Sequence, residues 1–207
     1  MQSTLLLSLM AFAVASSITP GPNNLMLLAS GANYGFKRTI PHILGVGLGF
    51  LFMMVVVGLG VGQMLQASPK VYTGLRLASL LYMGWLAYRI ATSGPVDGGA
   101  DNPHAKPMTF LQAVLFQWIN PKAIAMGLAA TATYTDPSRY VPSLLLVALV
   151  FGSINLPCVS AWAGFGVALR NWLKDPVQLR VFNVGMAVLL VVSFLPLVGS
   201  LFEDLAP

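Results

Sequence analysis

The sequence predicts an all-α integral membrane protein with six transmembrane helices, arranged as two inverted three-helix repeats with broken first and fourth helices. Three observations lead to this fold class. The composition is strongly apolar, the chain divides into six long apolar runs, and the first run of each half carries a proline–asparagine interruption.

The composition excludes an ordinary soluble domain. Hydrophobic residues make up 57% of the 207 residues and charged residues 8%, whereas soluble domains have about 25% charged residues. Spans of about 20 residues each leave room for six helices and no sizeable soluble domain. The net charge of +5 indicates Lys and Arg held in cytoplasmic loops and not nucleic-acid binding. The single cysteine cannot form an intrachain disulfide or a CxxC relay.

The apolar runs give one membrane transport domain made of two halves. Repeat one covers about 1–91, a polar linker covers 92–107, and repeat two covers about 108–207. Three spans per half make the second repeat inverted relative to the first. We expect the spans at about 3–30, 39–66, 70–91, 109–133, 141–170 and 177–201.

Loop charge predicts the orientation of the chain. The side formed by the first, third and fifth connections carries more cations, and cytoplasmic loops are enriched in Lys and Arg. Both termini are therefore predicted on the non-cytoplasmic side. The cations on the predicted cytoplasmic side are Lys37, Arg38, Arg89, Lys106, Arg170, Lys174 and Arg180, against Lys70, Arg76 and Arg139 on the other.

The first interruption lies at residues 19–24, which read TPGPNN. Pro20 and Pro22 have no N–H, so the carbonyls of Ser16 and Ile18 lose their helical partners. Irregular backbone at membrane depth must face protein or a watery cavity. The substrate-binding candidates here are Thr19, Gly21, Pro22, Asn23 and Asn24.

The second interruption lies at residues 117–122, which read QWINPK. Pro121 frees the carbonyl of Gln117, and Lys122 places an ammonium inside an apolar span at a cost of about 2.5–3.5 kcal/mol. About a dozen residues, roughly 18 Å of helix, separate Lys122 from either span end, which is too far to snorkel. The substrate-binding candidates here are Asn120, Pro121 and Lys122.

Matched interruptions in corresponding helices predict a transporter whose site lies between two discontinuous helices. The alternative is that both prolines only kink helices for packing. All six carboxylates fall in connections or the C-terminal tail, so no intramembrane acid pairs with Lys122. Because a buried ammonium needs a counter-charge, the sequence favours a substrate carboxylate, as in a zwitterionic amino acid.

Further candidates lie outside the two interruptions. His42 follows a proline and is either a proton carrier, given an ordinary pKa near 6.5, or a solvated interfacial histidine. Asn155 and Pro157 are candidates for opening the fifth span. Glycines spaced by four should let helix backbones approach closely, at Gly45 with Gly49, Gly58 with Gly62, Ala148 with Gly152, and Ser160 with Gly164.

The motifs resemble the LysE/RhtB family of amino-acid exporters. The similarity is carried by TPGPNN at 19–24, GANYGFKR at 31–38 with the glycine-rich run that follows, KPMTF at 106–110 and QWINPK at 117–122. It implies six spans in a bacterial inner membrane and proton-coupled export (antiport) of amino acids or their derivatives. The chain looks most like the branch with homoserine/threonine and cysteine/O-acetylserine exporters.

We therefore expect a transporter and not an enzyme, with no catalytic residue, cofactor or metal site. Its expected partners are a zwitterionic amino acid, protons and the lipid bilayer, and a homo-oligomer is left open. The alternative is an exporter of another small solute or a metal ion on the same scaffold, although a metal path would want intramembrane Asp, Glu, Cys or clustered His. A redox protein would need a second cysteine.

Overall fold

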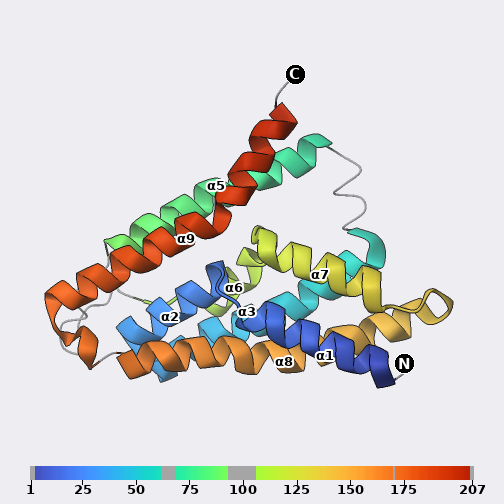
Figure 1. Ribbon diagram of the computed structural model, residues 1–207, viewed down its shortest axis with the longest axis horizontal. Coiled ribbons are helices and arrows are strands. Elements are labelled where there is room, and N and C mark those ends of the chain that lie inside the picture. Colours follow the sequence, from blue (N-terminus) through green and yellow to red (C-terminus); the bar gives the residue numbers. More distant parts are fainter. Residues whose placement is uncertain (1–2, 62–68, 93–105, 170, 206–207) are drawn as a thin grey trace.

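The computed structural model describes residues 3–61, 69–92, 106–169 and 171–205, and all regular structure in these ranges is helical (Figure 1). Each half has the same succession: a broken helix, a long helix, and one further helix. The first half contains α1 (Ser3–Ile18), α2 (Pro22–Tyr34), α3 (Phe36–Val56), η1 (Val57–Val61) and α5 (Pro69–Ala91). The second contains α6 (Phe110–Phe116), α7 (Pro121–Tyr134), η2 (Pro137–Arg139), α8 (Tyr140–Leu169), η3 (Trp172–Lys174) and α9 (Pro176–Leu205).

Length and hydropathy identify some, but not all, of the six predicted membrane spans among the described helices. In the described ranges, the helices Phe36–Gly60 and Pro137–Leu169 are long and apolar enough to cross a membrane, and α1 with α2 pass the same test together as a pair bent by 55°. The apolar part of α9, Pro176–Val192, is shorter. α5 covers the predicted span at 70–91, and most of the predicted linker lies outside the described residues.

α8 is the helix on which the first half packs. α1, α2 and α3 all contact it, and Figure 1 shows α8 running beneath α2 and crossing α1. Glycines allow the closest approach: a Cβ added at Gly31 of α2 would overlap the carbonyl of Ala163, and one at Gly166 of α8 would overlap the carbonyl of Leu28. The two backbones therefore touch with no side chain between them.

The glycine pairs of α3 behave as predicted where they can be followed. A Cβ at Gly45 would lie 2.5 Å from the Phe110 carbonyl oxygen, and one at Gly49 would lie 2.7 Å from the Cα of Val114. These two positions seat α6 directly on α3. The prediction fails for Gly164, which has open space around it.

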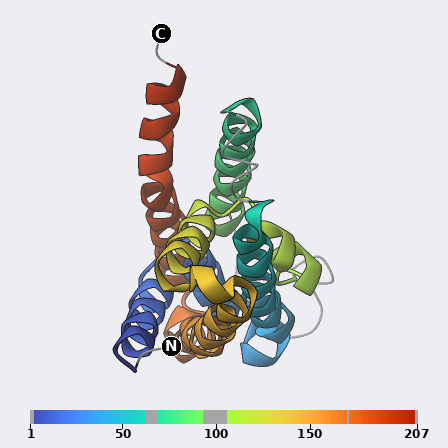
Figure 2. The same cartoon turned by 90° about the vertical axis from the view of Figure 1, so that its right-hand side faces the viewer.

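α5 and α9 lie side by side and rise away from the other helices, as both views show (Figures 1 and 2). Their lower parts join the bundle through an apolar cluster in which Met83 and Leu86 of α5 meet Leu190 of α9. Leu25 and Met26 of α2 belong to the same cluster. This contact ties the α5–α9 pair to the helix that follows the first break.

Described residues that flank the first, third and fifth connections lie at one end of the molecule. Ala32, near the end of α2, packs with Leu173 and Leu179, which flank the start of α9. Asn33 of α2 shares a cavity with Lys106 of the third connection. The start of α1 and the end of α7 lie at the opposite end, where the Ser8 and Tyr134 hydroxyls are 3.1 Å apart. This grouping follows from the alternation of the helices, and the side on which each end lies stays a prediction from loop charge.

Candidate functional site

The first break leaves three residues, 19–21, between α1 and α2. Pro22 occupies the first turn of α2, where a missing N–H costs nothing. Gly21 precedes it in extended backbone, with φ −176° and ψ 175°, a conformation open to any residue. Glycine is needed at this position because a larger residue would clash with Lys122: a Cβ there would lie 2.7 Å from Cδ of Lys122.

Side chains satisfy the carbonyls that the first break leaves without helical partners. Nδ2 of Asn24 donates to the carbonyls of both Ser17 and Thr19, at 2.8 Å each. The indole Nε1 of Trp162, from α8, donates to the carbonyl of Ile18 at 3.1 Å. The Thr19 hydroxyl donates to the carbonyl of Ser16 at 3.0 Å. The break is therefore not a simple kink, because side-chain donors pair with the carbonyls that it frees.

At the second break, the carbonyl that lacks a helical partner is satisfied by the backbone of the break itself. After α6 ends, the chain makes a tight turn in which the N–H of Asn120 bonds to the carbonyl of Gln117 at 3.4 Å, in place of the donor that Pro121 lacks. The side-chain oxygen of Asn120 then accepts from the N–H of Lys122 and caps α7. This cap fixes the direction of α7 and places Lys122 in its first turn.

The Lys122 ammonium joins the two breaks. Nζ donates to the carbonyl oxygen of Thr19 at 2.7 Å, to its hydroxyl at 2.9 Å and to the carbonyl of Pro20 at 3.2 Å. The cation of the second break therefore rests on the freed oxygens of the first. The side chain is half-buried and finds neutral oxygens instead of the carboxylate that the sequence lacks.

A second link between the breaks is an amide pair. Nδ2 of Asn23 donates to Oε1 of Gln117 at 2.8 Å, and Nε2 of Gln117 donates back to Oδ1 of Asn23 at 3.3 Å. Gln117 also donates to the carbonyl of Ala113 and is fully buried. Gln117 was not among the predicted site residues, although its place beside the Asn–Pro–Lys triplet was a usable signal.

α8 closes the site from the other side. Nδ2 of Asn155 donates to the Ser17 hydroxyl at 3.1 Å. The helix itself runs without a break from Tyr140 to Leu169, with Pro157 inside it, so the predicted opening of this span at Asn155 and Pro157 is wrong for this conformation. α1, α2 and α3 all pack against this helix.

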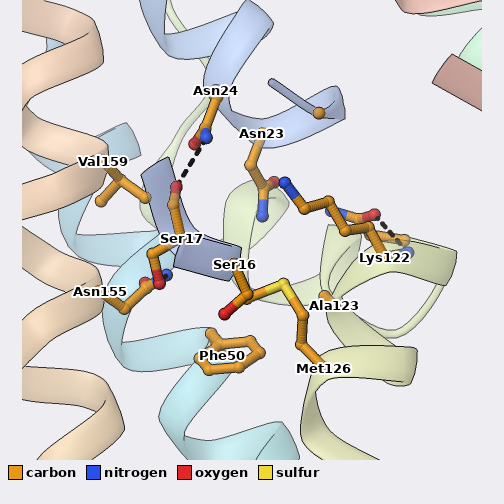
Figure 3. A pocket seen from close by; sticks show the side chains of 12 residues that line it. Ser16, Ser17, Asn23, Asn24, Phe50, Lys122, Ala123, Met126, Asn155 and Val159 are labelled. Atoms are coloured by element: carbon orange, nitrogen blue, oxygen red, sulfur yellow. Dashed lines mark hydrogen bonds between the residues drawn. The ribbon is translucent and has the colours of Figure 1, made fainter. Parts of the chain in front are cut away.

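A small cavity of about 20 Å³ lies between these groups, room for about one water molecule. Figure 3 shows Asn23, Asn24, Lys122 and Asn155 converging on it, with Phe50 and Met126 on its apolar side. Of the predicted residues, Gly21, Asn23, Asn24, Asn120, Lys122 and Asn155 line the cavity, Thr19 holds Lys122, and Pro22 and Pro121 set the helix starts. Ser16 and Ser17 were missed.

His42 lies elsewhere. Its ring is 1% exposed, so the expectation of a solvated interfacial histidine is wrong. Nδ1 lies 3.4 Å from the Ser30 hydroxyl, and Nε2 has no hydrogen-bond partner. His42 lines a second cavity with Asn33 and Lys106, and it is absent from the lining of the cavity at the two breaks.

Comparison with known proteins agrees with this architecture. Cysteine/O-acetylserine efflux proteins of Escherichia coli (strains HS and K12) and of Shigella sonnei are 30% identical to the chain over 196 residues, which is 92% of this chain and 96% of each relative. No solved structure matches the chain. The family model described as LysE type translocator matches residues 14–198. The chain therefore belongs to the LysE-type translocator family.

Proposed function

We propose that the protein is a secondary active exporter that moves small zwitterionic amino acids, or their derivatives, out of the bacterial cytoplasm in exchange for protons. Membership of the family supports the transport role, and the printed activity of the relatives supports the substrate class. The observation that carries the proposal is the Lys122 ammonium lying on the oxygens of the first helix break.

The substrate would bind by exchanging places with Lys122. The oxygens of Thr19 and Pro20 already hold one primary ammonium, so they suit the ammonium of an amino acid. Lys122, once displaced, would turn to the substrate carboxylate, beside Asn120 at the start of α7. A helix start favours a negative charge, and a charge-assisted hydrogen bond is roughly twice as strong as a neutral one.

The lining of the cavity supports an uncharged side chain on the substrate. Asn23, Asn24 and Asn155 provide amides, whereas Phe50 and Met126 provide an apolar wall. No carboxylate lines this cavity in the described structure, so a cationic side chain would find no counter-charge there. Cysteine and O-acetylserine, the substrates in the relatives' names, are both neutral zwitterions.

Alternating access would follow from the paired breaks. We propose six spans in two inverted repeats, supported by the repeated succession of elements in the two halves. In such transporters, one repeat rocks against the other around a fixed site between discontinuous helices. Here a substrate inserted between Lys122 and the first break would part the two breaks, and its release would let Lys122 return.

Proton coupling remains part of the proposal, with His42 as the candidate carrier. Histidine titrates in the physiological range in its ordinary state, and the other histidine, His104, lies in the linker. His42 is separate from the cavity at the breaks, so coupling through it would act on the movement of α2 and α3 and not on the substrate directly.

Transport by the purified protein tests this function. In proteoliposomes with an imposed pH gradient, we expect flux of O-acetyl-L-serine and L-cysteine, and none of L-cysteinamide, which lacks the carboxylate. The panel should include Cd²⁺ to test the alternative of metal export. Equal flux of an amino acid and its amide would contradict the carboxylate role of Lys122, and flux of Cd²⁺ without amino-acid flux would replace the proposal with the alternative.

A further inference from the structure

The larger of the two cavities lies between α2, α3, α5 and the residues that lead into α6. We infer that this second cavity is a binding site of its own for neutral zwitterionic amino acids, where a substrate is held before it reaches the two helix breaks. The inference rests on the proposed export function and adds a second binding site to the transport path.

The size of the second cavity suits a small ligand. Its volume is about 350 Å³, against about 20 Å³ at the breaks, and ligand pockets commonly measure about 300–1,000 Å³. The cavity at the breaks is closed around Lys122 in this conformation. The second cavity is the one that can hold a whole amino acid without any helix moving.

The charges of the second cavity fit a carboxylate at one wall. Lys106 lines this wall with Thr109 and Gln112. The last two form the capping box of α6, in which the Thr109 hydroxyl and Oε1 of Gln112 accept backbone N–H groups, so the hydroxyl proton and Nε2 of Gln112 can still donate to a ligand. Among the described residues, none that lines the second cavity is a carboxylate. A ligand carboxylate would therefore find a counter-ion and further polar groups there.

The opposite wall offers a place for the ligand's ammonium. Asn33 of α2 is buried, and its Oδ1 has no hydrogen-bond partner, while its Nδ2 donates to the carbonyl of Ala29 at 2.7 Å. Ser30 and His42 line the same wall. A buried acceptor without a donor costs about 1–3 kcal/mol. The oxygen is covered here, so a rotation of the Asn33 side chain is needed for a ligand donor to reach it.

The remaining wall is apolar and selects the ligand's side chain. Met26, Leu86, Ile90 and Met108 line it. These side chains favour an uncharged, partly apolar substituent, and none of the described lining residues is an acid that would pair with the side chain of a lysine or arginine ligand. The second cavity therefore selects the same class of molecule as the cavity at the breaks.

The two cavities lie one helical turn apart along α2. Asn23 lines the cavity at the breaks, and Met26 lines the second cavity, and residues three apart are neighbours on one helix face. The amide pair of Asn23 with Gln117 bridges α2 and the second break, one turn before Met26. A substrate that moves along α2 from the second cavity to Lys122 would pass this pair.

The second cavity also lies at the end expected for an exporter's entrance. Lys106 belongs to the third connection, and Asn33 lies beside the first. Loop charge predicts this end to be cytoplasmic, which is the side from which an exporter takes its substrate.

Site-directed labelling tests the inference. The background is Cys158→Ser with Lys122→Met, which disables binding at the breaks, and Met108→Cys places a thiol in the second cavity. O-acetyl-L-serine at about ten times its dissociation constant should slow labelling by a charged thiol reagent about tenfold, since only the empty site reacts. Lys37→Cys, exposed at the same end and outside the cavity lining, should label equally with and without substrate.

Adding Lys106→Gln to the Met108→Cys protein should remove most of the protection. Protection that persists with Lys122→Met and is lost with Lys106→Gln supports a separate site. Absence of protection at Met108→Cys, in a protein whose wild type exports the compound, overturns the second site and leaves the proposed function standing. Failure of the wild type to transport any amino acid overturns the proposed function itself.

Discussion

Lys122 shows at the scale of one residue what the sequence could and could not reveal. Its position in an apolar run and the lack of an intramembrane acid were readable from the sequence. Its actual partners, the oxygens of Thr19 and Pro20, are more than 100 residues away along the chain. The sequence identified the need for a partner, whereas only the fold shows that the first break supplies it.

Gly21→Ala should weaken transport without unfolding the protein. Backbone at Gly21 is extended, so alanine fits the conformation, but its Cβ would lie 2.7 Å from Cδ and 3.1 Å from Nζ of Lys122. The added methyl group would occupy the space in which Lys122 and the substrate ammonium exchange places, so the initial flux should fall by about tenfold or more. Gly185→Ala, in open space on α9, is the control. Unchanged flux in Gly21→Ala would show that the position of Lys122 is not important.

Asn24→Leu should destabilise the fold. Its amide is the donor for the carbonyls of Ser17 and Thr19, and leaving a buried acceptor unpaired costs about 1–3 kcal/mol. We expect a lower midpoint of thermal unfolding in detergent. Ser153→Ala, which removes an exposed hydroxyl bonded within its own helix, should change the midpoint little. Equal midpoints for the two variants would contradict the structural role of Asn24.

At the scale of elements, the two breaks are alike in position and different in construction. The first is satisfied by side chains that include Trp162 of α8. The second is satisfied by its own turn and by the cap of Asn120. Proline and asparagine mark both breaks in the sequence. The sequence could not predict the contribution of α8, because Trp162 lies 144 residues from its partner Ile18.

The sequence predicted that small residues allow helices to approach closely, but it did not predict all of the residues that make these contacts. Spacing by four correctly indicated close approach at Gly45 and Gly49, but it missed Gly31 and Gly166, which make the tightest contact between α2 and α8. Which glycine faces a neighbour depends on the rotation of each helix. Spacing alone does not determine that rotation. It identifies a face of small residues on a helix, but it does not show whether another helix packs against that face.

Gly166→Ala and Gly164→Ala make a matched pair for this contact. A Cβ at Gly166 would overlap the backbone of Leu28, whereas one at Gly164 meets nothing within 4 Å. Forcing the helices apart should cost about 1–3 kcal/mol, while Gly164→Ala should be neutral or stabilise α8 by up to about 1 kcal/mol. Thermal unfolding midpoints of the two variants in detergent measure the difference. Similar midpoints would contradict the close packing of α2 on α8.

At the scale of the whole molecule, the sequence predicted two halves of three spans each, and the described parts of the two halves repeat one succession of elements. Alternation of the spans places the first, third and fifth connections on one side, and their cations predict that this side is cytoplasmic. The bend of α1 against α2 and the projection of α5 and α9 were not predictable, because hydropathy gives the length of a span and not its angle.

Labelling of intact cells tests the predicted orientation. In a Cys158→Ser background, Arg139→Cys should react with a membrane-impermeant maleimide added outside, because Arg139 is exposed at the end away from the first connection. Lys37→Cys, exposed beside the first connection, should react only after the membrane is permeabilised. The reverse pattern would place the termini in the cytoplasm.

The central claim is that Lys122 and the first break form one amino-acid site, and flux of the Lys122→Met protein tests it most directly. The measurement is the initial rate of O-acetyl-L-serine transport in proteoliposomes with an imposed pH gradient, with each variant confirmed as folded by gel filtration. Lys37→Met, which removes an exposed lysine far from both breaks along the chain, is the control. We predict that Lys122→Met abolishes transport while Lys37→Met retains the wild-type rate; a normal rate with Lys122→Met would contradict the claim.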